Sequence, residues 1–340
     1  MKTPRRVGIH ILVAVLTFSS AALLCSQNAS GQPASPQKIK VLTLLGRPLQ
    51  IVAAEKQGLF AKYGIEVETA NKANSEELRS ELAAGNGALA YLAVDNAVAM
   101  VELAHQDVII VMGGEGSQNE LVVQPEIKSI ADLRGKTLIV DAANTAYALQ
   151  LIKILKLHGL NAGDYTLKPV GSTPQRLIAM REHKEYAGAM LGPPSSIVAK
   201  SEGFVSLGSV QESIGSYQAA GYFAERQWAQ GHRDTLANYL AAIIEAQRWL
   251  MDPANKQQVI DLMVKESHLA PDVAAENYEA VMTKPGGFER DARFDLEGFK
   301  NVLKLRAEVE GSWHGNPPPP DRYYDASYYN AALAKLKDSK

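Results

Sequence analysis

The chain has 340 residues, of which 35 are basic and 37 acidic, giving a formal charge of −2. This balance lacks the basic footprint of nucleic-acid-binding proteins, so nucleic acid is not an expected partner. The single cysteine, Cys25, excludes an intrachain disulfide. The length is sufficient for two compact domains.

Residues 1–31 have the layout of a secretory signal peptide. A basic start at residues 1–6 leads into an apolar run at residues 7–24, and small and polar residues follow. Ala29 and Gly31 form a candidate cleavage site. Removal of the leader leaves 32 basic and 37 acidic residues, a formal charge of −5, and no cysteine. We therefore expect an exported, periplasmic protein.

Two alternatives remain for the leader. The apolar run could stay as an uncleaved anchor helix, although it is marginal for a hydrocarbon core of about 30 Å. Cys25 could carry a lipid, but Leu24 stands where lipoprotein signals prefer a small residue. No later apolar run approaches membrane length, so we expect membrane contact only through a transporter or an uncleaved leader.

Beyond the leader, strand-like and helix-like segments alternate. Apolar or alternating runs predict strands at residues 38–45, 65–69, 88–94 and 108–112. Capping residues, Pro48 and glycine stops predict helices at residues 48–64, 74–85 and 95–105. The glycines of residues 113–116 predict a hinge, because glycine permits unusual backbone angles.

A second series of the same kind follows. Strands are predicted at residues 136–140, 165–170 and 187–191, and helices at residues 129–135, 144–159 and 173–182. Pro193 or Pro194 opens a further helix. From residue 226 onward the chain changes to helices, predicted at residues 236–251, 253–266, 271–282 and 296–310, and a proline run at residues 317–320 follows them.

This order of elements predicts an α/β fold with parallel-rich sheets covered by helices on both faces. Two strand-helix series and a helical return predict two lobes with a cleft between them. We place lobe 1 at residues 38–120 and 224–340, and lobe 2 at residues 121–223. Ligands of such sheets bind at the carboxyl ends of strands, beside helix N-termini.

Four segments, in this order and spacing, resemble a known family: residues 53–68, 82–95, 130–140 and 237–261. They are similar to the periplasmic solute-binding proteins of ABC importers, of the nitrate, sulfonate and taurine type, within the thiamine-pyrimidine-synthase-like superfamily. The resemblance implies the type 2 periplasmic-binding-protein fold, two lobes around a hinged cleft. The family usually has an Asp-Ala pair on the strand before the second-lobe proline. Residues 185–193 depart from that pattern, which puts the usual contacts from this strand in doubt.

The first strand-to-helix turn supplies one set of candidate ligand contacts. The Arg47 guanidinium could clamp a carboxylate, sulfonate or nitrate with paired hydrogen bonds. The helix that begins at Pro48 would add its positive end, and Gln50 would line the same wall. The alternative for Arg47 is a surface arginine paired with Glu55 or a neighbouring acid.

Equivalent turns supply the other candidates. Asn96, and less strongly Asp95, begins the helix after the third strand, where a capping role is the alternative. Asn144 and Thr145 begin the corresponding helix of the second lobe, whose N–H groups and hydroxyl could hold an anion.

Three further residues complete the candidate site. Pro193 faces the cleft by its position after a strand. Glu115 could meet a cationic group of the ligand. Tyr222 could pack on the ligand, with a place in the core as its alternative.

The resemblance implies an exported protein that captures a small, anionic organic or inorganic solute and delivers it to an ABC permease. We expect a monomer that uses no cofactor and no metal, since the histidines are scattered and no metal motif occurs. The first alternative is an enzyme on the same fold, of the thiamine-pyrimidine-synthase-like or menaquinone-pathway-like kind. The second is the binding component of a sensor or of a carrier other than an ABC transporter.

Overall fold

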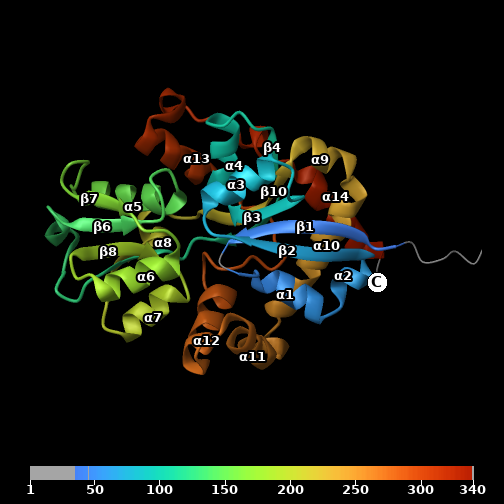
Figure 1. Cartoon of the computed structure of the whole chain (residues 1–340), viewed down its shortest axis with the longest axis horizontal. Coiled ribbons are helices and arrows are strands. Elements are labelled where there is room, and N and C mark those ends of the chain that lie inside the picture. Colours follow the sequence, from blue (N-terminus) through green and yellow to red (C-terminus); the bar gives the residue numbers. More distant parts are fainter. Residues whose placement is uncertain (1–34, 45, 339–340) are drawn as a thin grey trace, which may run out of the picture. The chain divides into compact units, whose positions relative to one another are not determined.

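A computed structural model describes residues 35–44 and 46–338 of the chain. The predicted leader, with Cys25 and the candidate cleavage site, lies outside the described residues. The described residues form two five-stranded sheets with helices around them (Figure 1).

The first sheet combines four strands from the N-terminal part of the described chain with one strand from its middle. These are β1 (Gln37–Leu44), β2 (Ile65–Lys72), β3 (Leu89–Ala93), β4 (Val108–Gly116) and β10 (Gln218–Glu225). Their order is β2-β1-β3-β10-β4. β1 pairs in parallel with β2 and β3, whereas β10 runs antiparallel to β3 and β4. The first sheet is therefore completed only after the chain has built the second.

The second sheet repeats this arrangement. Its strands are β5 (Glu120–Val123), β6 (Thr137–Val140), β7 (Thr166–Pro169), β8 (Tyr186–Leu191) and β9 (Val205–Ser209). Their order is β7-β6-β8-β5-β9, and β5 runs antiparallel to β8 and β9. Both sheets are thus mixed, because one strand in each, β10 in the first and β5 in the second, runs antiparallel to its neighbours.

The chain leaves the first sheet after Gly116 and returns to it at Gln218. The boundary that we placed after residue 223 falls inside β10, so residues 218–223 pair within the first sheet and not within the second. The sequence analysis missed β5, β9 and β10. β5 and β9 are too short to show a clear alternation, and β10 is rich in alanine and glycine, which have low strand propensity.

Helices pack on both faces of each sheet. Around the first sheet lie α1 (Leu49–Lys56), α2 (Leu59–Lys62), α3 (Ser75–Ala83), α4 (Asp95–Glu102), α9 (Arg226–Gly231), α10 (Arg233–Leu250), α11 (Lys256–Ser267), α12 (Pro271–Tyr278), α13 (Leu296–Glu310) and α14 (Ala326–Asp338). Around the second lie α5 (Ala146–Leu157), α6 (Thr173–Glu182), α7 (Ser195–Ser201) and α8 (Val210–Ser213). Figure 1 shows α5 on one face of the second sheet and α6 with α7 on the other. The helix predicted at residues 48–64 is divided, because Gly58 adopts a left-handed φ of 67° between α1 and α2.

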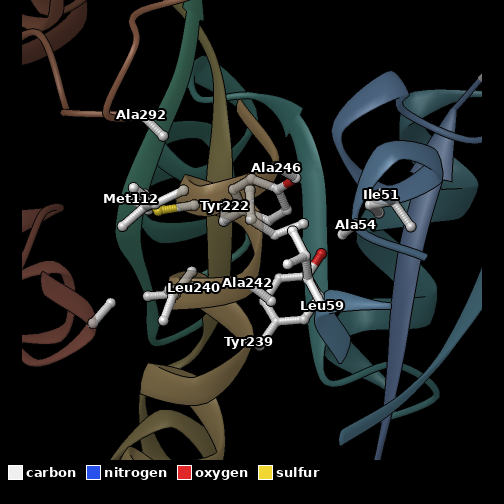
Figure 2. Close-up of a cluster of buried hydrophobic side chains, with 14 of the residues drawn as sticks. Ile51, Ala54, Leu59, Met112, Tyr222, Tyr239, Leu240, Ala242, Ala246 and Ala292 are labelled. Carbon is white, nitrogen blue, oxygen red and sulfur yellow. The ribbon is translucent and has the colours of Figure 1, made fainter. Parts of the chain in front are cut away.

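Helix α10 forms the centre of the core beneath the first sheet (Figure 2). Tyr239 and Leu240 of this helix are fully buried, and its small side chains, Ala242 and Ala246, let the helix lie close to the strands. Tyr222 of β10 is also fully buried, with its ring centroid 5.7 Å from that of Tyr239. Tyr222 is therefore a core residue, which was the alternative to its predicted ligand contact.

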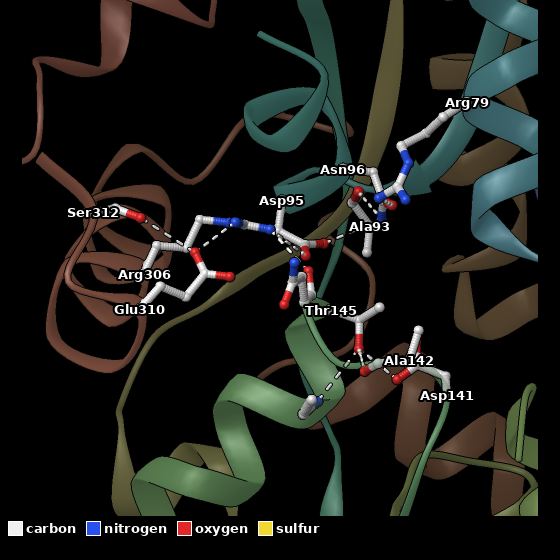
Figure 3. A network of polar contacts seen from close by, with 12 residues as sticks. Arg79, Ala93, Asp95, Asn96, Asp141, Ala142, Thr145, Arg306, Glu310 and Ser312 are labelled. Carbon is white, nitrogen blue, oxygen red and sulfur yellow. Dashed lines mark hydrogen bonds and ion pairs between the residues drawn. The ribbon is translucent and has the colours of Figure 1, made fainter. Parts of the chain in front are cut away.

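A buried ion pair joins the C-terminal helices to both sheets. Arg306 of α13 lies 3.3 Å from the carboxylate of Asp95, and their side chains are 3% and 2% exposed. The same guanidinium nitrogen donates to the backbone carbonyl of Asn144, immediately before α5, at 3.0 Å. The other terminal nitrogen donates to Glu310 at 2.8 Å (Figure 3). Arg306 thus connects the start of α4, beside the first sheet, with the start of α5, beside the second.

Burial determines how Asp95 titrates. It raises the pKa of Asp95 from 3.8 to about 6, against the opposing effect of the Arg306 charge. Because the pKa in the fold lies above the ordinary value, protonated Asp95 stabilises the fold at low pH. That contribution is lost as the pH rises through about 6.

The glycines of β4 have a different role from the predicted one. None of Gly113, Gly114 and Gly116 has a positive φ, so the predicted use of unusual backbone angles is wrong. A Cβ at Gly113 would lie 2.5 Å from the carbonyl oxygen of Arg293, and one at Gly116 would lie 2.9 Å from Gly286. These glycines are needed because neighbouring segments approach the strand closely.

We expect Gly113→Ala to destabilise the fold by about 1–3 kcal/mol, because the added methyl group collides with backbone that cannot rotate away. Gly231→Ala is the matched control, since a Cβ there meets nothing within 4 Å. The control should be neutral or stabilising by up to about 1 kcal/mol. Urea denaturation measures both, and equal stability of the two variants would contradict the close-approach explanation.

We expect Arg306→Gln to destabilise the fold by about 3–5 kcal/mol at about pH 8, because ionised Asp95 then lacks its counter-charge. The loss should be smaller at about pH 5, where Asp95 is mostly protonated and the pair is already weakened. Urea denaturation at the two pH values measures the difference.

Glu310→Gln, which leaves the contact between Arg306 and Asp95 intact, is the control for that experiment and should show little pH dependence. A loss in Arg306→Gln that is the same at both pH values would show that the packing of Arg306, and not its charge, stabilises the fold.

Candidate functional site

A cavity of about 600 Å³ lies where the two sheets face each other. The first sheet contributes Tyr91 and Ala93 of β3 and the loop before α3. The second contributes Asp141 after β6, the start of α5 and Pro193 after β8. These positions are mostly the carboxyl ends of parallel strands, where α/β sheets bind their ligands.

Five of the predicted site residues line this cavity: Asp95, Asn96, Glu115, Thr145 and Pro193. Asn96 lies in the first turn of α4 and Thr145 immediately before α5, as expected from the turns that they occupy. Pro193 precedes α7 and forms a cis peptide bond with Pro194. The strand-to-helix turns were thus correctly located from the sequence.

The other five predicted residues, Arg47, Pro48, Gln50, Asn144 and Tyr222, are not among the residues that line the cavity. Arg47 is exposed and forms an ion pair with Glu55, which was the alternative weighed from the sequence. Gln50 is buried and donates to the Tyr91 hydroxyl at 2.9 Å, so it supports the wall from behind. Asn144 is exposed and contributes its carbonyl to Arg306.

The start of α5 presents polar groups to the cavity. Thr145 is the N-cap, accepting from the Ala148 N–H at 3.4 Å and donating its hydroxyl proton to Asp141. Burial raises the pKa of Asp141, while the charge of Arg176 and the bond from Thr145 oppose that shift. The positive end of this helix, with Ala146 and Tyr147 in its first turn, lines the cavity.

Arg176 of α6 is a buried cation in the second wall. One terminal nitrogen donates to Thr173 at 3.1 Å and to the carbonyl of Met190 at 3.0 Å. Its guanidinium lies over the ring of Tyr147, 4.6 Å from the centroid. These contacts fix the guanidinium in place, so Arg176 gives the wall a rigid positive charge next to Asp141.

Arg79 of α3 is the cation of the first wall. It is half-buried and donates to the Asn96 side chain at 3.0 Å, and Asn96 in turn donates to the Ala93 carbonyl at 3.1 Å. A guanidinium has five donors. A single hydrogen bond to Asn96 therefore orients Arg79 and leaves donors to reach a solute.

Glu115 is the acid at the end of β4. Burial alone raises its pKa from 4.5 to about 7. Its charge contributes to the raised pKa values of Tyr91 and Tyr147, two tyrosines of the cavity wall. Glu115 and these two tyrosines line the same cavity.

The sequence analysis missed Arg79, Arg176, Tyr91 and Tyr147. Arg79 and Arg176 lie on helices that the sequence predicts, but the sequence patterns of these helices do not show which arginine turns inward. The capping box before α6, in which Ser172 and Gln175 bond reciprocally, could have drawn attention to this turn.

The described part of the chain contains no group of three or more His, Cys, Asp and Glu residues that could hold a metal ion. Within the same residues, no helix combines the length and apolar character needed to cross a membrane.

Three solved structures show what the chain resembles. A protein of Bordetella bronchiseptica RB50 aligns with a TM-score of 0.75 and 19% identity, over 89% of this chain and 99% of that one. The ligand-binding component of an ABC-type import system from Staphylococcus aureus, with zinc bound, has a TM-score of 0.72 and 17% identity, over 87% and 99%. The periplasmic nitrate-binding protein of Synechocystis PCC 6803 has a TM-score of 0.72 and 14% identity, over 89% and 91%.

At these identities the alignments establish the fold, which is the predicted two-lobed fold of periplasmic binding proteins. The same fold also carries catalysis, since a desulfurization enzyme aligns with a TM-score of 0.62 and 12% identity over 88% of this chain and 99% of that one. A comparison with curated protein sequences yields no match. A family model described as the NMT1-like family matches residues 43–264, more than half of the chain, and the protein therefore belongs to the NMT1-like family.

Proposed function

We propose that this protein captures a small solute in the cavity between its two sheets and delivers it to the permease of an ABC importer. The observation that carries this proposal is the cavity itself, whose walls come from both sheets. A solute that contacts both walls only when they are close together binds the closed form more tightly than the open form. It therefore shifts the population toward the closed form. The closed form is then what a permease would recognise.

The walls suit a solute with an acidic group. Arg79 and the positive end of α5 offer hydrogen-bond donors from opposite sides of the cavity, and Arg176 adds a fixed positive charge. A carboxylate, a sulfonate or a smaller oxyanion accepts such bonds. The ligand-binding component from Staphylococcus and the nitrate-binding protein from Synechocystis, which share the fold, support solute capture as the function.

The proposed place of action is the periplasm. It rests on the predicted export signal at residues 1–31 and on the nitrate-binding relative, which is periplasmic. An enzyme on the same fold is the alternative, supported by the desulfurization enzyme. The second alternative is the binding component of a sensor or of another carrier. Solute binding measured in the presence and absence of a candidate permease distinguishes this alternative.

A thermal-shift screen tests solute capture. The purified chain is melted with a panel of carboxylates, sulfonates, nitrate, pyrimidines and their amino derivatives, since a ligand of the native state raises the melting temperature. Each compound that binds is then incubated with the protein and recovered. Recovery of the unchanged compound supports capture. Conversion of more than one molecule of the compound per protein molecule would instead establish an enzyme.

We expect Arg79→Ala to weaken binding of an acidic solute by at least about tenfold, or about 1.4 kcal/mol, because it removes the free donors of the first wall. Arg47→Ala is the matched control, since Arg47 lies outside the cavity and bonds with Glu55. Its dissociation constant should stay within about twofold of the unmutated protein. Isothermal titration measures both variants, and the opposite ranking would restore Arg47 as the anion clamp predicted from the sequence.

A further inference from the structure

Glu115 lies where the cavity meets a second hollow. It is the penultimate residue of β4, and it lines both the cavity of about 600 Å³ and a neighbouring space of about 470 Å³. Gly116 next to it bonds through its N–H to the carbonyl of Gly287 at 3.1 Å. This loop contact fixes the backbone at Glu115, so its carboxyl group has a defined place at the floor of the cavity.

The carboxyl group of Glu115 differs from those of Asp95 and Asp141, two other acids of the cavity, in having no partner within the described residues. Asp95 is paired with Arg306, and Asp141 accepts from Thr145. Within the described residues, no hydrogen bond or ion pair reaches the Glu115 carboxylate; its contacts with Gln218 and Phe288 use the backbone. Glu115 is half-buried and lines the cavity, so a ligand bound there can supply the missing partner.

The surroundings of Glu115 suit a positive charge. Tyr91 and Tyr147, from opposite walls, are the cavity residues whose pKa values its charge raises. Aromatic rings attract cations through their electron-rich faces. Neither Arg79 nor Arg176 contributes to the pKa of Glu115, for which burial is the only cause. Glu115 therefore shares the cavity with two aromatic side chains, and within the described residues no cation is bonded to its carboxylate.

We infer that the solute carries a protonated nitrogen, an ammonium or amidinium group, which binds to Glu115 between Tyr91 and Tyr147. This inference rests on the proposed capture of a solute in the cavity, and it specifies the solute class. A solute that also has an acidic group would place it toward Arg79 and the start of α5, which makes the ligand zwitterionic. A plain inorganic anion would leave Glu115 unpaired.

Matched pairs of compounds test this inference, each pair differing mainly in the amine. Thermal shifts and titration calorimetry compare taurine with ethanesulfonate, β-alanine with propanoate, and benzylamine with benzyl alcohol. We expect the amine of at least one pair to bind at least about tenfold more tightly than its partner. The Glu115→Gln variant should lose this preference, because an amide has the size of the carboxyl group without its charge.

Glu76→Gln is the matched control, since Glu76 lines the same cavity at an exposed position. It should keep the amine preference. Without ligand, the Glu115→Gln variant should melt at the same temperature as the unmutated protein or higher, because within the described residues the carboxylate has no partner that the amide would lose. A lower melting temperature with weaker binding of every compound would instead indicate that Glu115 has a structural role, and would overturn the inference.

The outcomes separate the inference from the proposed function. If only the compounds without an amine bind, the inference is overturned while solute capture stands. The same holds if amines bind and the Glu115→Gln substitution does not change their affinity. If no compound of the pairs or of the larger panel raises the melting temperature, both the inference and the proposed function fail.

Discussion

The buried guanidinium of Arg306 is the contact on which the arrangement of the two sheets depends. It comes from α13, late in the chain, and it reaches both the acid at the start of α4 and the carbonyl before α5. The two walls of the cavity are thereby joined at one end through a single charged group. Any movement of the walls has to pivot near this group or break it, and breaking it would leave Asp95 buried without its counter-charge.

The order of strands and helices was enough to predict the fold and several of the turns that line the cavity. Parallel strands followed by helices place their turns at one edge of each sheet, so Asn96 and Thr145 could be assigned to the cavity from the sequence. Arg47 occupies an equivalent turn, yet Glu55, the penultimate residue of α1, engages its guanidinium. Topology therefore predicts where a turn lies, whereas local pairing decides whether its side chain reaches the ligand.

The remaining parts of the site depend on packing that a linear pattern does not contain. Arg176 faces inward because Thr173 of the same helix and the carbonyl of Met190 on β8 accept its protons. The glycines of β4 look like a hinge in the sequence, but the backbone of Arg293 and of Gly286 requires them. Both features result from long-range approach, which only the assembled fold reveals. Strand β10 was missed because its alanine- and glycine-rich sequence has low strand propensity, and pairing with β3 and β4 holds it in the sheet.

The charges of the cavity limit which solutes can fill it. A space of about 600 Å³ lies in the usual range for organic ligands and is far larger than an inorganic oxyanion needs. The donors of Arg79 and α5 can satisfy an acidic group, but they do nothing for the unpaired acid of Glu115. Since both kinds of group are buried on binding, a tight ligand has to supply partners for each of them. Opposite charges at two ends of one molecule meet this requirement, and they also give the two walls different contacts to gain as they close.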